Sequence, residues 1–106
     1  MARAHRIGEE SSRKFLLHIE VTWPPDGDPE EKERRIAGEG ARARELAADG
    51  TIKRLWRIPG TWSNWGIWEA PDATALHAAV TSLPMWPYLE VEVFPLADHP
   101  NDPGAR

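Results

Sequence analysis

Cysteine is absent from this chain of 106 residues, so it has no disulfide, no thiolate nucleophile and no cysteine-based zinc site. Long apolar runs are missing as well. No segment approaches the length of a signal-peptide core or a membrane-spanning helix, which predicts a cytoplasmic protein with no membrane partner. An excess of positive charge is also lacking, because the formal net charge is −4. That charge argues against nucleic acid as a partner.

The familiar catalytic and cofactor motifs are not found either. There is no glycine-rich phosphate loop and no Ser/His/Asp nucleophile motif. The histidines are scattered without the spacing of metal ligands, at His5, His18, His77 and His99. The sequence therefore predicts no metal site, and His77 is interpreted as structural.

Tryptophan, by contrast, is abundant, with six in a chain long enough for one domain. Apolar periodicity predicts a strand at 15–23, a helix at 29–48, strands at 52–58 and 64–69, a helix at 73–83 and a strand from residue 89. This β-α-β-β-α-β order predicts an α+β, ferredoxin-like fold, with an antiparallel sheet and both helices on one face. We expect a flexible leader at 1–13, one domain at 14–100 and a tail at 101–106.

Local signals set the ends of the predicted elements. Asp28 and Asp72 are expected to cap the two helices, and Gly50 to close the first one. The expected apolar stripe of the first helix is thin and consists of Ile36, Ala37, Ala43, Leu46 and Ala47. In the last strand, Leu89, Val91 and Val93 share a face, and Pro95 ends the pairing or places it at a sheet edge.

Two prolines, Pro84 and Pro87, bound an aromatic corner before the last strand. The corner holds Met85, Trp86 and Tyr88, which either line a pocket or plug the core; the second alternative is the more common fate of such residues. If both helices cover one face of the sheet, the other face needs a partner, because tryptophan is rarely left exposed in a patch. We therefore expect self-association through the sheet.

Glu39 is the leading candidate for proton transfer. It lies between Gly38 and Gly40, where missing side chains leave space around its carboxylate. A carboxyl group in apolar surroundings has a raised pKa and suits proton transfer near neutral pH. The alternative is an ordinary solvated helical glutamate.

Other candidates lie on the predicted strands. His18 and Glu20 share a strand face and can point into one cleft, although His18 is equally well explained as structural. Arg57 and Asn64 flank a predicted tryptophan cluster and could hold a carboxylate or lactone oxygen, or else pair across strands. That cluster is Trp56, Trp62, Trp65 and Trp68.

The sequence resembles the muconolactone Δ-isomerase family, which includes chloromuconolactone dehalogenase-like proteins. The resemblance covers about residues 15–100. It rests on Leu55-Trp56-Arg57-Ile58-x-Gly60, on Asn64, on Leu76-His77, and above all on Leu83-Pro84-x-x-Pro87-Tyr88-x-Glu90-Val91-Glu92-Val93-x-Pro95-Leu96 with His99-Pro100. It implies a ferredoxin-like fold, ring-shaped homodecamers, no cofactor, and isomerisation of a small butenolide by moving a proton across the ring.

Two positions depart from the family pattern. The family helix motif Lys-Ala-x-Glu reads Ile36-Ala37-Gly38-Glu39 here, and Glu20 replaces a family arginine, although His18 matches some members. With two cationic positions lost and bulky tryptophans present, the resemblance implies a substrate bulkier or less charged than muconolactone. Aromatic degradation or secondary metabolism is the expected setting.

Three hypotheses follow. The first is a cofactor-free isomerase, or a related cyclase or lyase, with Glu39 as base, His18 or Glu20 as proton partner, and Arg57 and Asn64 stabilising an enolate. The second is a non-catalytic small-molecule binder. The third is a structural oligomer whose tryptophans only form interfaces. The residues expected to contact substrate are Arg57, Asn64, Trp56, Trp65, Trp68, Trp86 and Tyr88.

Overall fold

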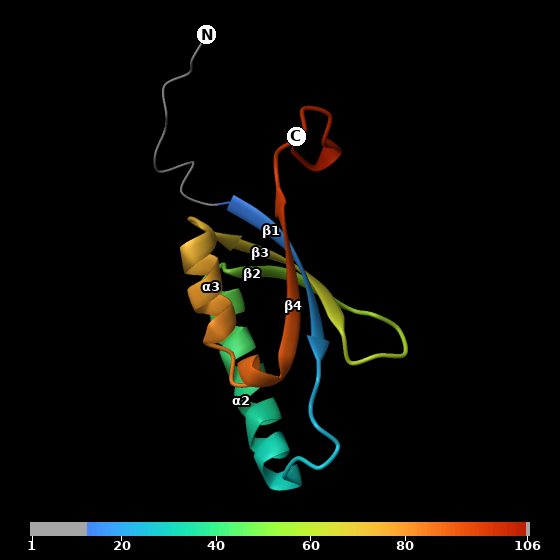
Figure 1. The fold of residues 1–106 in the computed structure, drawn as a ribbon. Coiled ribbons are helices and arrows are strands. Elements are labelled where there is room, and N and C mark those ends of the chain that lie inside the picture. The colour runs from blue at the N-terminus through green and yellow to red at the C-terminus, as the bar shows by residue number, and fades with distance from the viewer. Residues whose placement is uncertain (1–12, 106) are drawn as a thin grey trace.

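Alternating apolar residues form the strands of one sheet, and two capped helices connect them (Figure 1). The computed structural model describes residues 13–105. Its elements are β1 (Arg13–Val21), α2 (Pro29–Ala48), β2 (Ile52–Arg57), β3 (Asn64–Ala70), α3 (Ala73–Thr81), the short 3₁₀ turn η1 (Trp86–Tyr88), β4 (Leu89–Leu96) and a second turn η2 (Pro103–Ala105). The predicted leader lies outside the described residues, except for Arg13, which begins β1.

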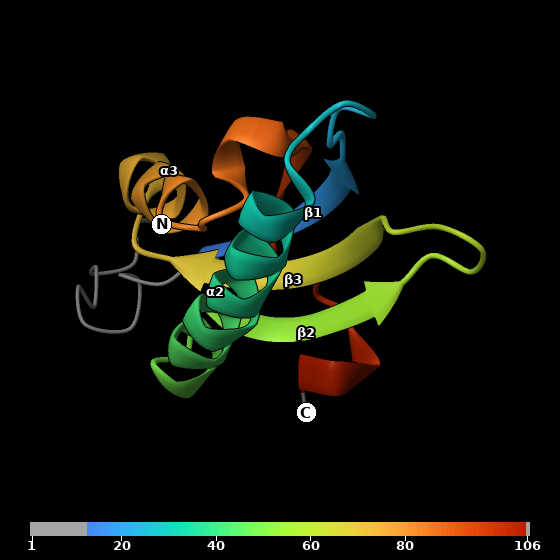
Figure 2. The same ribbon diagram turned by 90° about the horizontal axis from the view of Figure 1, so that it is seen from below.

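The sheet confirms the predicted fold class. Its strand order is β2-β3-β1-β4, and every neighbouring pair is antiparallel. Both helices lie on one side of it (Figure 1), and from below α2 is seen to cross β3 and β2 (Figure 2). The order β-α-β-β-α-β with this pairing is the ferredoxin-like arrangement. Pro95 lies within β4, an edge strand, where its missing N–H is tolerated.

The core lies between the sheet and the helices. It is built from Phe15, Leu17, Ile19, Leu46, Ile52, Trp68, Ala70, Leu76, Val80 and Leu83. Trp68, only 1% exposed, fits because Gly66 has no side chain. A Cβ at Gly66 would lie 2.7 Å from Leu55 Cδ2, which is closer than packed atoms allow, and 3.0 Å from Trp68 Nε1, which is a tight contact. The glycine therefore makes room for the indole against the strand.

The predicted caps at Asp28, Asp72 and Gly50 are confirmed, although α3 ends at Thr81 rather than at residue 83. The Asp28 carboxylate accepts a hydrogen bond from the Glu30 amide at 3.1 Å, and Asp72 accepts one from the Ala75 amide at 2.8 Å. Both satisfy amides that a helix start leaves without partners. Gly50 follows α2 with φ +89°, the left-handed conformation that favours glycine.

The predicted apolar stripe of α2 is wrong at Ile36, Ala37 and Ala47. Leu46 is buried and Ala43 packs against the core, but Ala37 and Ala47 are exposed and Ile36 is 52% exposed. Ile36 lies two turns before Ala43 and so shares its side of the helix. The first half of α2, which includes Ile36, extends beyond the end of the strands (Figure 1).

The predicted tryptophan cluster does not form, because its members lie on different surfaces. Trp68 belongs to the core, whereas strand register places Trp56 opposite Trp65 on the face without helices, here called the open face. Trp62 lies in the β2–β3 hairpin and is 78% exposed. Among residues 13–105, no helix is long and apolar enough to span a membrane.

Candidate functional site

Glu39 lies on the side of α2 that faces the segment between α3 and β4. Its Oε1 accepts a hydrogen bond from the Met85 backbone amide at 2.9 Å. Burial raises the pKa of this carboxyl group above its ordinary value, and the hydrogen bond from Met85 partly opposes that rise. The carboxylate is thus oriented by the backbone and partly withdrawn from water. Such a group can take up a proton near neutral pH more readily than an exposed glutamate.

The glycines beside Glu39 have different surroundings. A Cβ at Gly38 would lie 3.2 Å from Cγ of Pro84, so glycine permits close approach of the proline ring. A Cβ at Gly40 would meet only the flexible end of Arg44, at 3.4 Å. The space expected around Glu39 is therefore filled by Pro84 on one side, and this contact brings Met85 within reach of the carboxylate.

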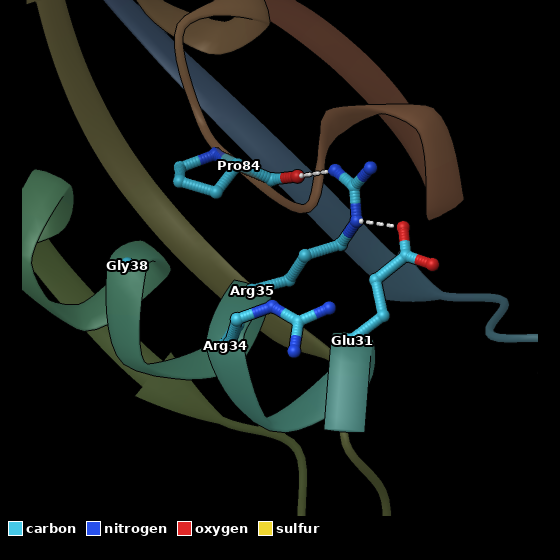
Figure 3. Close-up of a pocket in the computed structure, with 5 residues that line it drawn as sticks. All are labelled: Glu31, Arg34, Arg35, Gly38 and Pro84. Atoms are coloured by element: carbon cyan, nitrogen blue, oxygen red, sulfur yellow. Dashed lines mark hydrogen bonds and ion pairs between the residues drawn. The ribbon is translucent and has the colours of Figure 1, made fainter. Parts of the chain in front are cut away.

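A groove runs along α2 next to this contact (Figure 3). Its volume is about 430 Å³, and it is lined by Glu31, Arg34, Arg35, Gly38 and Pro84. Arg35 is occupied: its Nε donates to Glu31 at 2.9 Å and its Nη1 donates to the Pro84 carbonyl at 2.6 Å. Within the described part of the chain, no hydrogen bond or ion pair occupies the guanidinium of Arg34.

His18 and Glu20 lie on the other side of the sheet from Glu39. Phe15, Leu17 and Ile19 face the helices, so the alternate residues of β1 point to the open face. There His18 Nδ1 lies 3.1 Å from Glu92 Oε1, and its ring packs on Trp65 at 4.8 Å between centroids. Within one chain, neither residue can exchange a proton directly with Glu39, so the expected pairing is not formed in the single chain.

The other predicted site residues are likewise dispersed. Arg57 Nη1 donates to the Trp62 carbonyl at 2.6 Å, at the hairpin. Asn64 pairs with Ile19 and so faces the helices, and its Oδ1 is buried without a hydrogen-bond partner in the described chain. Trp68 Nε1 is also buried without a hydrogen-bond partner in the described chain. The Trp56 ring carries the Arg54 guanidinium at 4.6 Å on the open face.

The aromatic corner divides between core and surface. Met85 is buried and so plugs the core. Trp86 is 37% exposed and packs edge-on against the His77 ring, with 6.2 Å between the ring centroids. The Tyr88 ring packs on the Trp23 ring, with 4.3 Å between centroids. The Arg35 guanidinium lies over Tyr88, with its Cζ 5.2 Å from the ring centroid. Tyr88, next to Arg35 of α2, and Trp86, next to His77 of α3, thus lie on the helix side, unlike Trp56 and Trp65. Among residues 13–105, no three potential metal-ligating side chains gather.

Comparison with known proteins gives one consistent result. The family model described as muconolactone delta-isomerase matches residues 14–102. The chain belongs to the muconolactone Δ-isomerase family. It is 38% identical to a muconolactone Δ-isomerase from Pseudomonas aeruginosa over 82% of this chain and 93% of that protein. It is 36% identical to one from Rhodococcus opacus over 83% and 95%. A crystal structure of a muconolactone isomerase superimposes with a TM-score of 0.80 at 34% identity, covering 85% of this chain and 94% of that one.

The two departures from the muconolactone Δ-isomerase pattern lie far apart in this member. Ile36 is on α2, on the helix side, and Glu20 is on β1, opposite Glu90 on the open face. Within one chain, cations at these two positions could not hold the same substrate carboxylate. What the sequence reasoning missed is the series Glu31, Arg35 and Glu39 at four-residue intervals along α2. Helical periodicity alone places these three charged side chains on one side of the helix.

Proposed function

We propose that this protein is a cofactor-free isomerase that moves a proton next to the carbonyl of a lactone, with Glu39 as the base. The observation that carries the proposal is the half-buried Glu39 carboxylate, whose pKa is raised by burial and which the Met85 amide orients. Membership of the muconolactone Δ-isomerase family supports a butenolide as the substrate class.

The proposed chemistry is balanced without an external reagent. The Glu39 carboxylate removes a proton from the ring carbon that lies next to the conjugated system, and the bonding electrons delocalise toward the lactone carbonyl. Glu39, now protonated, returns the proton to another ring carbon, so the C=C bond shifts and nothing is oxidised or lost. The enolate oxygen needs hydrogen-bond donors. The proposed first donor is the Asn64 amide, on the helix side of β3. The proposed second donor is Arg57, whose Nη1 binds the Trp62 carbonyl at the hairpin. Trp86 and Tyr88 are the proposed apolar contacts.

A further question is whether the substrate carries a carboxylate, as muconolactone does. The loss of basic residues at Ile36 and Glu20 favours a substrate bulkier or less charged than muconolactone. Two findings weigh on the other side: the tryptophans do not gather around one pocket, and Arg34 presents an unoccupied guanidinium in the groove next to Glu39. We propose that Arg34 takes over the carboxylate, because guanidinium binds carboxylate with two parallel hydrogen bonds. Assaying the wild type on muconolactone, with the product followed by NMR, tests the activity itself.

Replacing Arg34 with glutamine should then raise KM for muconolactone by about tenfold and leave kcat nearly unchanged. A charge-assisted hydrogen bond at a partly exposed site contributes about 1.5 kcal/mol, which corresponds to about tenfold in affinity. Arg44 lies on the same helix, outside the groove, and Arg44→Gln is the matched control. Steady-state kinetics of both variants measure the difference. Equal KM values for the wild type and Arg34→Gln would show that Arg34 does not bind the substrate carboxylate, and would favour a substrate less charged than muconolactone.

Self-association through the open face is the second part of the proposal. This face exposes Trp56, Trp65, Phe94 and Leu96, each between 37% and 45%. These side chains belong to β2, β3 and β4, and across β1 the Trp65 and Phe94 ring centroids lie 6.3 Å apart. A patch of this kind is typical of an interface, and a second copy of the chain is its proposed occupant.

Light scattering at micromolar concentration should therefore give a mass well above the 11.9 kDa of one chain. Phe94→Glu, which places a charge within the open face, should shift the protein toward the monomer. Trp62→Glu is the control, because Trp62 is the most exposed tryptophan and lies in the hairpin. A monomeric wild type would contradict the proposal, and so would a Trp62→Glu variant that dissociates while Phe94→Glu does not.

A further inference from the structure

A single peptide group joins Arg35 to Glu39. The carbonyl oxygen of Pro84 accepts a hydrogen bond from Arg35 Nη1 at 2.6 Å, and the N–H of the next residue, Met85, donates to Glu39 Oε1 at 2.9 Å. The carbonyl and the N–H belong to the same planar, resonance-stabilised unit. The guanidinium and the carboxylate thus bind the two opposite ends of one peptide dipole.

Arg35 is itself fixed in place for this contact. Its Nε donates to Glu31 Oε1 at 2.9 Å, one turn back along α2, and its guanidinium lies over the Tyr88 ring at 5.2 Å. Figure 3 shows the side chain extended from α2 toward the Pro84 carbonyl, with Glu31 beside it. Three contacts therefore hold a side chain that would otherwise be free to move in solvent.

We propose that Arg35 is a positioning residue for Glu39, which it holds in place and tunes through the Pro84–Met85 peptide group. This inference rests on the proposed function, in which Glu39 is the base. A cation on the carbonyl oxygen polarises the peptide and makes its N–H a stronger donor, because linked hydrogen bonds reinforce one another. The stronger donor stabilises the ionised form of Glu39 against the effect of burial, so that the base is free of its proton at lower pH.

Several charged or titratable groups lie on the elements packed around Glu39. They are Glu31, Arg34, Arg35 and Arg42 on α2, His77 on α3, Tyr88 on η1 and, on the helix-facing side of β2, Arg57. Arg42 binds Ser82 Oγ and Glu45 instead, each at 2.9 Å. Among residues 13–105, Arg35 is the one of these groups whose side chain donates a hydrogen bond to the peptide that holds Glu39.

The test compares pH profiles of kcat/KM for the wild type, Arg35→Met, Arg35→Lys and Arg42→Met on the lactone. In Arg35→Met the acid limb should move to higher pH, and the rate on that limb should fall several-fold with a smaller change at the alkaline plateau. Arg35→Lys, which keeps the charge, should lie closer to the wild type. Arg42→Met is the matched control: it removes a similar bond from α2 to the segment after α3 and should leave the limb in place.

A direct titration makes the outcome independent of turnover. With ¹³C-labelled glutamate, the carboxyl shift of Glu39 should titrate at higher pH in Arg35→Met than in the wild type, and Glu39→Gln identifies the signal by its loss. Equal titration midpoints, or an equal shift in Arg42→Met, would overturn the inference. If Arg35→Met does not fold, the comparison of Arg35→Lys with the wild type decides. A Glu39→Gln enzyme that keeps full activity would instead overturn the proposed function, while the titration still judges the link to Arg35.

Discussion

Replacing Glu39 with glutamine is expected to lower kcat by about 10²- to 10⁴-fold, the usual effect of removing a general base. The amide has the shape of the carboxyl group, and its oxygen can still accept the hydrogen bond that Met85 now donates at 2.9 Å. It cannot, however, take up the proton that the isomerisation must move. Steady-state kinetics together with a binding titration separate the two effects, because the variant should still bind.

Three other outcomes of this experiment are informative. A Glu39→Gln variant that turns over within a few-fold of the wild type would move the chemistry away from α2. The residue to examine next is then His18, which lies on the open face with Glu92 at 3.1 Å. A wild type that binds lactones without converting any of them would favour the small-molecule binder. A variant that loses binding would show that Glu39 contributes to recognition rather than to proton transfer.

The same variant should have a characteristic pH dependence of stability. The pKa of Glu39 is raised by burial, so between the unfolded and folded pKa values the native state binds more protons than the unfolded state. The contribution of this carboxyl group to stability is therefore greatest below its unfolded pKa and is lost as the pH rises through the folded one. Relative to the wild type, Glu39→Gln should become more stable as the pH rises above about 4.5. Urea unfolding at several pH values measures the difference and serves as the folding control.

The fold was predictable because its signals are local. Asp28, Gly50 and Asp72 act on amides and carbonyls within a few residues of themselves, so their effect can be read without knowing the tertiary structure. Strand alternation is equally local, and it correctly separates Leu89, Val91 and Val93 from their neighbours. The order β-α-β-β-α-β then favours the ferredoxin-like arrangement, because it pairs four such strands through short connections with both helices on one side of the sheet.

The site was harder to predict because it depends on which side of the sheet the helices choose. Trp65 and Trp68 are three residues apart in one strand, which is an odd separation. The alternation of side chains along a strand therefore places Trp65 and Trp68 on opposite faces. It also places His18 on the face that does not meet α2. The bonds from α2 to the Pro84–Met85 peptide could not be predicted, since residues almost fifty positions apart meet only after α2 and α3 pack.

Trp68→Ala should be the most destabilising single substitution proposed for this chain, with a cost of about 3–5 kcal/mol. The indole is 1% exposed and packs in the core beside Gly66, so truncation leaves a large cavity that the backbone cannot close. Such a loss is a large share of the roughly 5–15 kcal/mol that holds a domain of this size folded. Urea unfolding followed by far-ultraviolet circular dichroism measures it without relying on the fluorescence of the remaining tryptophans.

Trp56→Ala is the matched control for Trp68→Ala. Trp56 is 45% exposed on the open face, where it carries the Arg54 guanidinium at 4.6 Å, and its loss should cost less than about 1 kcal/mol. A Trp68→Ala variant that stays as stable as this control but no longer binds lactone would restore the sequence-based role of Trp68 as a substrate contact. A Trp56→Ala variant that is as unstable as Trp68→Ala, and also smaller by light scattering, would show that the open face is buried against a second copy. Because the two tryptophans lie on opposite faces of one sheet, the comparison separates the core from the interface in a single experiment.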